Sequence, residues 1–482
     1  MTLRKIANIL IFILIIIIFT FTIIRYEGNK FYYVNFSLIS NFTLFYGFRN
    51  KSFFFDNFFS LLLWLGFWFK LSIQITLMDS MFPEGAGNFD FNPSSYDDVI
   101  NIVNYGLLGF IVGSFIREKL YYHKNINLQT SHVTYFYFQY RKVILLIFFS
   151  FIILFAILNL KFHLYQKGTI PSLILPLKIN YLFGWLLTFG FASISSLIIY
   201  AEFFSKTKKK FNGLVVGFLE VFISSISILS RAMIFNGFSL LLGYYRTKEI
   251  INKKINTKEI ISYLMLLLIL FFFSLIVVSK LRQIQNFPIG HEVHSYLPSI
   301  NLSSKNKVIE NTIVETNKIL KDINQILFLI AGRWVGIEGI MSVYSLNEKS
   351  FKFFVKSFKE EFDYNNSFYE NKVKKSFHKY KNEPKIYTVY TPGLFAYLFY
   401  TGSKFFLLSG VFFMTLIASV FEFVACKISR NNLIFSSLIG NILAYRLAHF
   451  GYMPLNSYKI ILALLMTIFF VYVILKILKK IN

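Results

Sequence analysis

Residues 212–245 run NGLVVGFLEVFISSISILSRAMIFNGFSLLLGYY, an almost wholly apolar stretch that carries Glu220 and, near its middle, Arg231. One straight helix of this length would be about 50 Å long, whereas the hydrocarbon core of a bilayer is about 30 Å thick. We therefore predict two short helices that meet near Ser230 and Arg231. Arg231 then lies at one membrane face, either as a functional residue or as an arginine that reaches the interface from a helix end.

The composition of the whole chain is that of a membrane protein. Its 482 residues are 55% hydrophobic and 15% charged, whereas soluble proteins carry about 25% charged residues. The net charge is +26, but Lys and Arg lie mainly between the apolar runs, as the positive-inside rule requires. The surplus also suits anionic lipid head groups or a phosphorylated substrate, and we expect no nucleic acid as a partner. The single cysteine, Cys426, excludes a disulfide framework.

Repeated apolar runs predict an all-α, multi-pass membrane protein with about eleven or twelve transmembrane helices. Two come from the opening stretch, and residues 31–48 form a span, a re-entrant segment or an interfacial helix. The other predicted spans are 6–24, 53–76, 99–116, 143–160, 181–200, 260–279, 403–425, 433–448 and 458–478. The chain thus divides into an N-terminal transmembrane bundle (1–279), a long outer loop containing helices (280–391) and C-terminal transmembrane helices (392–482).

The charges of the loops predict the orientation of these spans. Lys and Arg concentrate in cytoplasmic loops, which here are 117–142, 203–211 and 246–259. The acidic loop 78–98, the turn at Arg231, the long loop and residues 449–457 then share the opposite, outer face.

The long loop contains a second arginine in an unusual setting. Apolar residues recur at three- and four-residue spacing from Ile309 to Ile330, which predicts an amphipathic helix. It leads into residues 332–339, GRWVGIEG, whose three glycines permit tight turns and close approach of a ligand. One interpretation is a helix that ends at glycine, with Arg333 paired to Glu338 at an interface. The other is a loop that returns to the membrane and brings Arg333 to the face of Arg231.

Several further polar residues are candidates for a site. His291 and His294 lack the spacing of the HExxH zinc motif and have no evident third ligand, so no metal site is predicted. Lys70 lies in a predicted span and needs an ion-pair partner or a water-filled cavity. Arg446 and His449 are one helical turn apart at the outer end of a span, where they are interfacial anchors or part of a site.

Arg231, Arg333 and Arg446 are thus predicted on one face of the bundle. Arginine binds phosphate and diphosphate through paired hydrogen bonds and stays charged at any physiological pH. The chain resembles the O-antigen polymerase (Wzy-like) family of oligosaccharide repeat-unit polymerases. The resemblance rests on about eleven or twelve predicted spans, one long outer loop late in the chain, and the arginine-bearing segments SRAMIFNGFSLLLG and AGRWVGIEG.

The resemblance implies a glycosyltransferase C-type-like helical bundle and glycosyl transfer at the periplasmic face of a bacterial inner membrane. One undecaprenyl-diphosphate-linked oligosaccharide would be the donor and another the acceptor, which builds a surface polysaccharide such as the O-antigen of lipopolysaccharide. Arg231, Arg333 and Arg446 would bind the diphosphate. Glu338, or else His449 or an acid of residues 78–98, would accept the proton of the acceptor hydroxyl. No metal, nucleotide or other cofactor is needed, and chain-length regulator and flippase proteins would be further partners.

Two other functions remain open. An O-antigen ligase, or another glycosyltransferase that uses a lipid-linked sugar, would share this chemistry, but a ligase attaches finished polymer to a lipid core. A flippase or exporter of lipid-linked oligosaccharide is expected to have near-equal halves and charges in the centre of its bundle.

Overall fold

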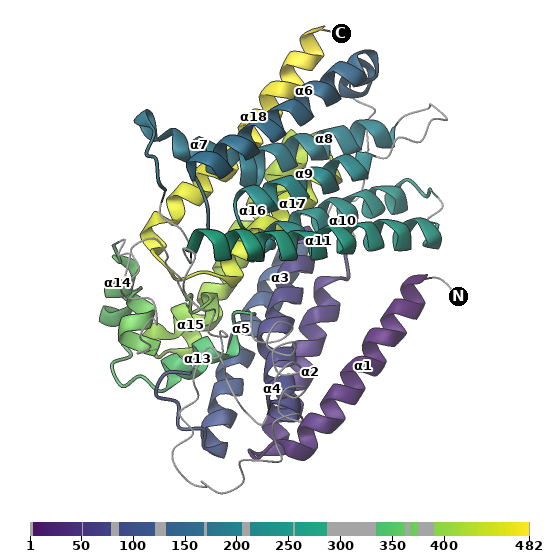
Figure 1. Cartoon of the computed structure of the whole chain (residues 1–482). Helices are drawn as coiled ribbons and strands as arrows, with labels where there is room; N and C mark the ends of the chain where they lie inside the picture. Colours follow the sequence, from purple (N-terminus) through teal and green to yellow (C-terminus); the bar gives the residue numbers. More distant parts are fainter. Residues whose placement is uncertain are drawn as a thin grey trace, which may run out of the picture.

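The computed structural model is helical in all the regular structure of its described residues (Figure 1). The structure describes residues 3–50, 52–78, 86–120, 132–167, 171–204, 213–253, 256–286, 334–361, 367–374 and 390–481. Within them, seven helices are long and apolar enough to cross a membrane, and three shorter apolar helices accompany them. The chain is therefore an all-α, multi-pass membrane protein by length and composition of its helices. The predicted total of about eleven or twelve spans stays a prediction.

One hydrophobic core is built by the N-terminal helices together with α16. The helices are α1 (Leu3–Arg25), α2 (Lys30–Gly47), α3 (Phe54–Trp64), α4 (Lys70–Leu77), α5 (Pro93–Leu120) and α16 (Lys404–Ile428). Helices α5 and α16 approach closely because Gly109 and Gly113 of α5, four residues apart, leave room for the α16 backbone. A Cβ atom at Gly109 would clash with the carbonyl oxygen of Leu408.

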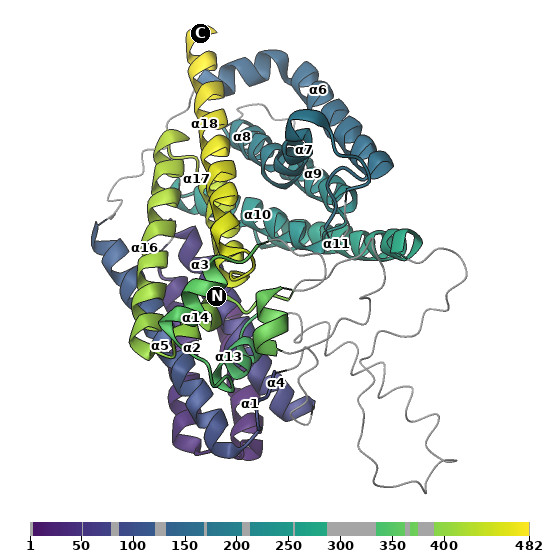
Figure 2. The ribbon, with the colours of Figure 1, turned by 90° about the vertical axis from the view of Figure 1, so that its left-hand side faces the viewer.

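A second core forms between helices from the middle of the chain. They are α6 (His132–Phe162), α8 (Phe191–Phe203), α9 (Gly213–Ser227), α10 (Ile234–Ile250) and α11 (Thr257–Asn286). Figures 1 and 2 show α10 and α11 running across the direction of α2 and α5. Helix α17 (Leu433–Ala448) contacts both α3 and α10 and so joins the two groups, and α18 (Tyr458–Ile481) packs near it in a third core.

The predicted break within residues 212–245 is confirmed. Helix α9 ends at Ser227, and a 3-10 turn, η4 (Arg231–Met233), leads into α10. The Ser225 hydroxyl donates a hydrogen bond of 2.8 Å to the Ser230 carbonyl oxygen and so fastens the turn. Arg231 therefore lies between the ends of two helices, not in the middle of one.

The described parts of the long outer loop pack against the first core. They include α13 (Ile337–Tyr344) and α14 (Phe351–Phe358), and the short α15 (Leu394–Leu398) follows the loop. The Tyr344 hydroxyl donates to Asp98 Oδ2 at 2.7 Å, which ties α13 to the start of α5. The predicted helix from Ile309 to Ile330 lies outside the described residues, as do His291 and His294.

Candidate functional site

Cationic side chains gather where α6 and α17 end, at the α9–α10 turn, and near the end of α11. With one neighbouring histidine they are Lys167, Arg231, Arg282, Arg446 and His449. Lys167 follows α6, and its backbone N–H donates to the Ile228 carbonyl oxygen at 3.0 Å. Arg282 donates through Nη2 to the carbonyl oxygens of Leu229, at 2.6 Å, and Lys167, at 3.3 Å. The turn after α9 is therefore held between the loop after α6 and the last turns of α11.

A cavity opens beside this cluster, between the start of α10, α17 and the π-helical turn η3 (Leu186–Gly190). We call it the basic cavity; its open space is about 370 Å³ when space continuous with the surroundings is included. Its polar lining consists of Lys167, Thr188, Asn236, Asn441, Tyr445 and Arg446. Asn441 Nδ2 donates to Asn236 Oδ1 at 3.3 Å, and Asn236 Nδ2 donates to the Thr188 carbonyl oxygen at 3.2 Å. Two cations beside neutral hydrogen-bonding groups form a lining suited to a phosphorylated ligand.

The positive charge of this cavity is not offset within the described chain. No described carboxylate lies within ion-pair distance of Lys167 or Arg446. Burial, with the nearby charges of Arg446 and Arg282, lowers the pKa of Lys167 to about 7. A bound anion would reverse this shift, because it favours the protonated amine.

His449 lies beside the cavity in its neutral form. Burial, with the charges of Lys167 and Arg446, lowers the pKa of His449 to about 4. Its Nδ1 lies 2.9 Å from the Tyr445 carbonyl oxygen, which can only accept a hydrogen bond. Nδ1 therefore carries the proton, and the lone pair is on Nε2. The imidazole stacks on the Tyr445 ring with 4.1 Å between centroids, which fixes its plane.

A row of aromatic rings joins the basic cavity to the long outer loop. The Trp334 and Phe235 centroids are 6.1 Å apart, and those of Phe235 and Tyr445 are 5.8 Å apart. Phe235 and Tyr445 both line the cavity. Trp334, where the described residues 334–361 of the loop begin, therefore lies next to the cavity wall.

Glu338 lies in a buried ion pair with Lys70. The Lys70 ammonium donates to Glu338 Oε2 and, at 2.8 Å, to the Trp334 carbonyl oxygen. Gln74 Nε2 donates to Glu338 Oε1 at 3.0 Å. A second π-helical turn, η1 (Leu65–Phe69), directly precedes Lys70 and lies against residues 335–336. Since both carboxylate oxygens accept hydrogen bonds from the first core, these contacts favour an anchoring role for Glu338.

The structure brings together three of the predicted site residues, Arg231, Arg446 and His449. Arg333 lies outside the described residues, and Glu338 belongs to the separate ion pair with Lys70. Lys167 and Arg282 were missed by the sequence reasoning. The available signal was their charge. Arg282 lies in the long loop predicted on the outer face, where the positive-inside rule leaves few cations, and Lys167 lies between the predicted spans 143–160 and 181–200.

Comparisons with known proteins assign no family. No family model, no curated protein and no solved structure matches the chain. In the part of the chain that the structure describes, no group of three or more His, Cys, Asp or Glu residues is placed to hold a metal ion. The functional argument therefore depends on the chemistry of the basic cavity.

Proposed function

We propose that the protein binds a lipid-linked diphosphate sugar in the basic cavity and polymerises oligosaccharide repeat units into a surface polysaccharide. The observation that carries the proposal is the uncompensated charge of Lys167 and Arg446 in one cavity, with Arg231 and Arg282 beside it. A diphosphate offers the negative charge and the acceptor oxygens that such a lining lacks.

The proposed reaction is glycosyl transfer without a covalent enzyme intermediate. The acceptor hydroxyl oxygen forms a bond to the anomeric carbon of the donor, while the bond from that carbon to the diphosphate oxygen breaks. The diphosphate leaves with the electron pair. Lys167 and Arg446 stabilise the charge that develops on it, because their positions are fixed before the reaction begins.

His449 is the residue best suited to take the acceptor proton. It is neutral at physiological pH and has its lone pair on Nε2. Its low pKa makes it a weak base in the free protein, and the negative charge of a bound diphosphate would raise that pKa toward the range of a general base. Glu338 was the first candidate from the sequence, but its two oxygens accept hydrogen bonds from Lys70 and Gln74. We therefore assign proton transfer to His449 in the proposed mechanism.

The finer architecture belongs to the same proposal. It comprises a glycosyltransferase C-type-like bundle of about eleven or twelve spans in the bacterial inner membrane, with the basic cavity toward the periplasm. Chain-length regulator and flippase proteins are the expected partners.

The proposal is tested in the source bacterium by replacing Arg446 with Ala and examining the surface glycan on a gel. Lys459→Ala is the matched control, because Lys459 is an exposed cation at the start of α18 and lies over the Tyr181 ring. We expect Arg446→Ala to reduce the ladder of polymer lengths to single repeat units and Lys459→Ala to leave it unchanged. A normal ladder from a normally expressed Arg446→Ala protein would refute the assignment, and long chains left unattached to lipid would indicate a ligase.

A further inference from the structure

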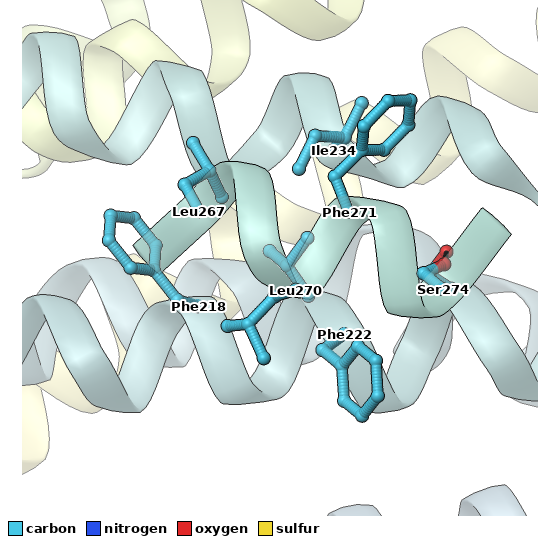
Figure 3. Close-up of a pocket in the computed structure, with 9 residues that line it drawn as sticks. Phe218, Phe222, Ile234, Leu267, Leu270, Phe271 and Ser274 are labelled. Atoms are coloured by element: carbon cyan, nitrogen blue, oxygen red, sulfur yellow. Dashed lines mark hydrogen bonds between the residues drawn. The ribbon is translucent and has the colours of Figure 1, made fainter. Parts of the chain in front are cut away.

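We propose that an apolar slot between α9, α10 and α11 holds the start of the hydrocarbon tail of the lipid whose diphosphate occupies the basic cavity. This inference rests on the proposed function and gives its lipid substrate a second subsite. Figure 3 shows the slot, whose apolar walls include Phe218, Phe222, Ile234, Leu267, Leu270 and Phe271. The open space among these side chains is about 220 Å³ when space continuous with the surroundings is included.

The slot borders the lipid-facing surface of the helices. Phe222, Leu270 and Phe271 are partly exposed, whereas Phe218 and Leu267 are buried deeper. On α11, Ile269 beside the slot is 48% exposed and Phe273 is 58% exposed. An apolar helix with such side chains on its surface is in contact with hydrocarbon when it lies in a membrane. A lipid tail can therefore enter the slot from the bilayer without crossing polar surface.

One end of the slot is polar and leads to the cationic cluster. Figure 3 shows Ser274 at the opposite end of the slot from Phe218 and Leu267. The Ser274 and Ser225 hydroxyl oxygens are 2.6 Å apart, and Ser225 also donates to the Ser230 carbonyl oxygen. Arg231 follows Ser230 directly. The slot thus changes from apolar side chains to hydroxyl groups along one direction, and the hydroxyl end is tied to the residue that precedes Arg231.

The slot and the basic cavity share one wall, the start of α10. Ile234 lines the slot, whereas its neighbours Met233 and Phe235 line the basic cavity. Arg231, three residues before Ile234, donates through Nη2 to Ser279 Oγ of α11 at 2.9 Å. A molecule with an anionic head and a hydrocarbon tail matches both spaces at once. A water-soluble sugar diphosphate would match only the cavity.

The test measures binding to the full-length protein in nanodiscs. Farnesyl diphosphate is the probe with a tail, and inorganic diphosphate is the probe without one. Leu270→Trp fills the slot from α11, and Ile269→Trp is the matched control because it adds the same group to the exposed face of the same helix turn. We expect Leu270→Trp to weaken farnesyl diphosphate binding on the order of fivefold or more, since contact for even a few methylene groups is lost. Binding of inorganic diphosphate should be equal in both variants and the wild type.

Three outcomes overturn the slot as a tail site. The first is equal binding of farnesyl diphosphate by Leu270→Trp and Ile269→Trp. The second is a wild-type protein that does not prefer the probe with a tail. The third is loss of that preference when phosphatidylglycerol is added, which would show a phospholipid chain in the slot. Failure of the head-group site has a different signature. In that case Arg446→Ala would bind both probes as the wild type does, while Leu270→Trp would still weaken binding of the farnesyl probe.

Discussion

Two clusters of charged side chains in this protein are built on opposite principles. In the first core, Arg117 lies between two carboxylates, with Nη1 2.7 Å from Asp56 Oδ1 and Nη2 2.9 Å from Glu422 Oε2. Glu422 also accepts hydrogen bonds from the first backbone N–H groups of α3. Around the basic cavity, Lys167 and Arg446 instead face like charges. Arg117 and its carboxylates offset one another's charge, whereas no described carboxylate lies within ion-pair distance of Lys167 or Arg446.

The difference teaches how a structural charge and a functional charge can be told apart. A buried charge is tolerated when it is paired and hydrogen-bonded. When one partner is removed, the other stays buried and its desolvation penalty is no longer offset. A cluster of like charges gains nothing for the free protein, because its members repel one another. Charges of the second kind are therefore candidates for binding.

The largest expected effect is on stability, at the paired cluster. Arg117→Met leaves Glu422 buried without its cation and leaves Asp56 with only the longer contact to Arg49, at 3.6 Å. We therefore expect the free energy of unfolding to fall by about 3–5 kcal/mol. Thermal unfolding of the purified protein measures it. Lys119→Met, two residues along the same helix and exposed, is the control. Equal unfolding temperatures for the two variants would contradict the conclusion that Arg117 stabilises the fold by offsetting the buried carboxylates.

The next effect is on binding, at the cationic cluster. We expect Arg446→Ala to weaken binding of inorganic diphosphate by about tenfold to a hundredfold, because hydrogen bonds to charged groups contribute about 1.5–3 kcal/mol. Its unfolding temperature should stay at the wild-type value or rise, since a repulsive charge is removed. A fall in stability as large as that of Arg117→Met, with unchanged diphosphate binding, would reverse the roles of the two clusters.

Lys167 gives the cationic cluster a dependence on pH. Its pKa of about 7 lies among the charges of Arg446 and Arg282 and beside His449, which is neutral above pH 5 because its own pKa is about 4. Lys167 is protonated below pH 7, and bound diphosphate raises its pKa, so binding should weaken as pH rises above 7. The slope is at most about tenfold per pH unit for one proton. Lys167→Arg stays charged and should lose this part of the pH dependence; an identical profile would exclude Lys167 from the site.

The smallest expected effect is a shift in unfolding temperature when a simple anion binds to the cationic cluster. Sulfate at millimolar concentration, compared with chloride at equal ionic strength, should raise the unfolding temperature of the wild type by about 1–2 °C, because a ligand of the folded state stabilises it. The Arg446→Ala protein should not respond. Equal shifts in both proteins would indicate a general salt effect and no anion site.

The sequence was sufficient for the features that depend on local pattern. The length of the apolar run 212–245 predicted the break that places Arg231 between α9 and α10. That prediction succeeded because helix length is a property of neighbouring residues. Loop charges predicted that Arg231, Arg446 and His449 share one membrane face; the structure places the three near the basic cavity, and the face itself stays a prediction.

Features that depend on distant contacts could not be predicted in this way. The partner of Lys70 is Glu338, 268 residues away, and no periodicity indicates that pairing. Lys167 lies in a segment interrupted by Pro171 and Pro176, whose position over the basic cavity depends on how α6 packs on α9. The π-helical turns η1 and η3 also have no signature in the pattern of apolar residues, because one extra residue per turn is imposed by tertiary packing.

The most direct test of the basic cavity is a cryo-electron microscopy structure of the full-length protein in nanodiscs with farnesyl diphosphate. We expect the diphosphate within hydrogen-bond distance of Lys167 Nζ and the Arg446 guanidinium, with the tail directed along α11. A diphosphate bound elsewhere on the protein, with the cavity between Lys167 and Arg446 empty, would contradict the proposal that this uncompensated charge is the substrate site.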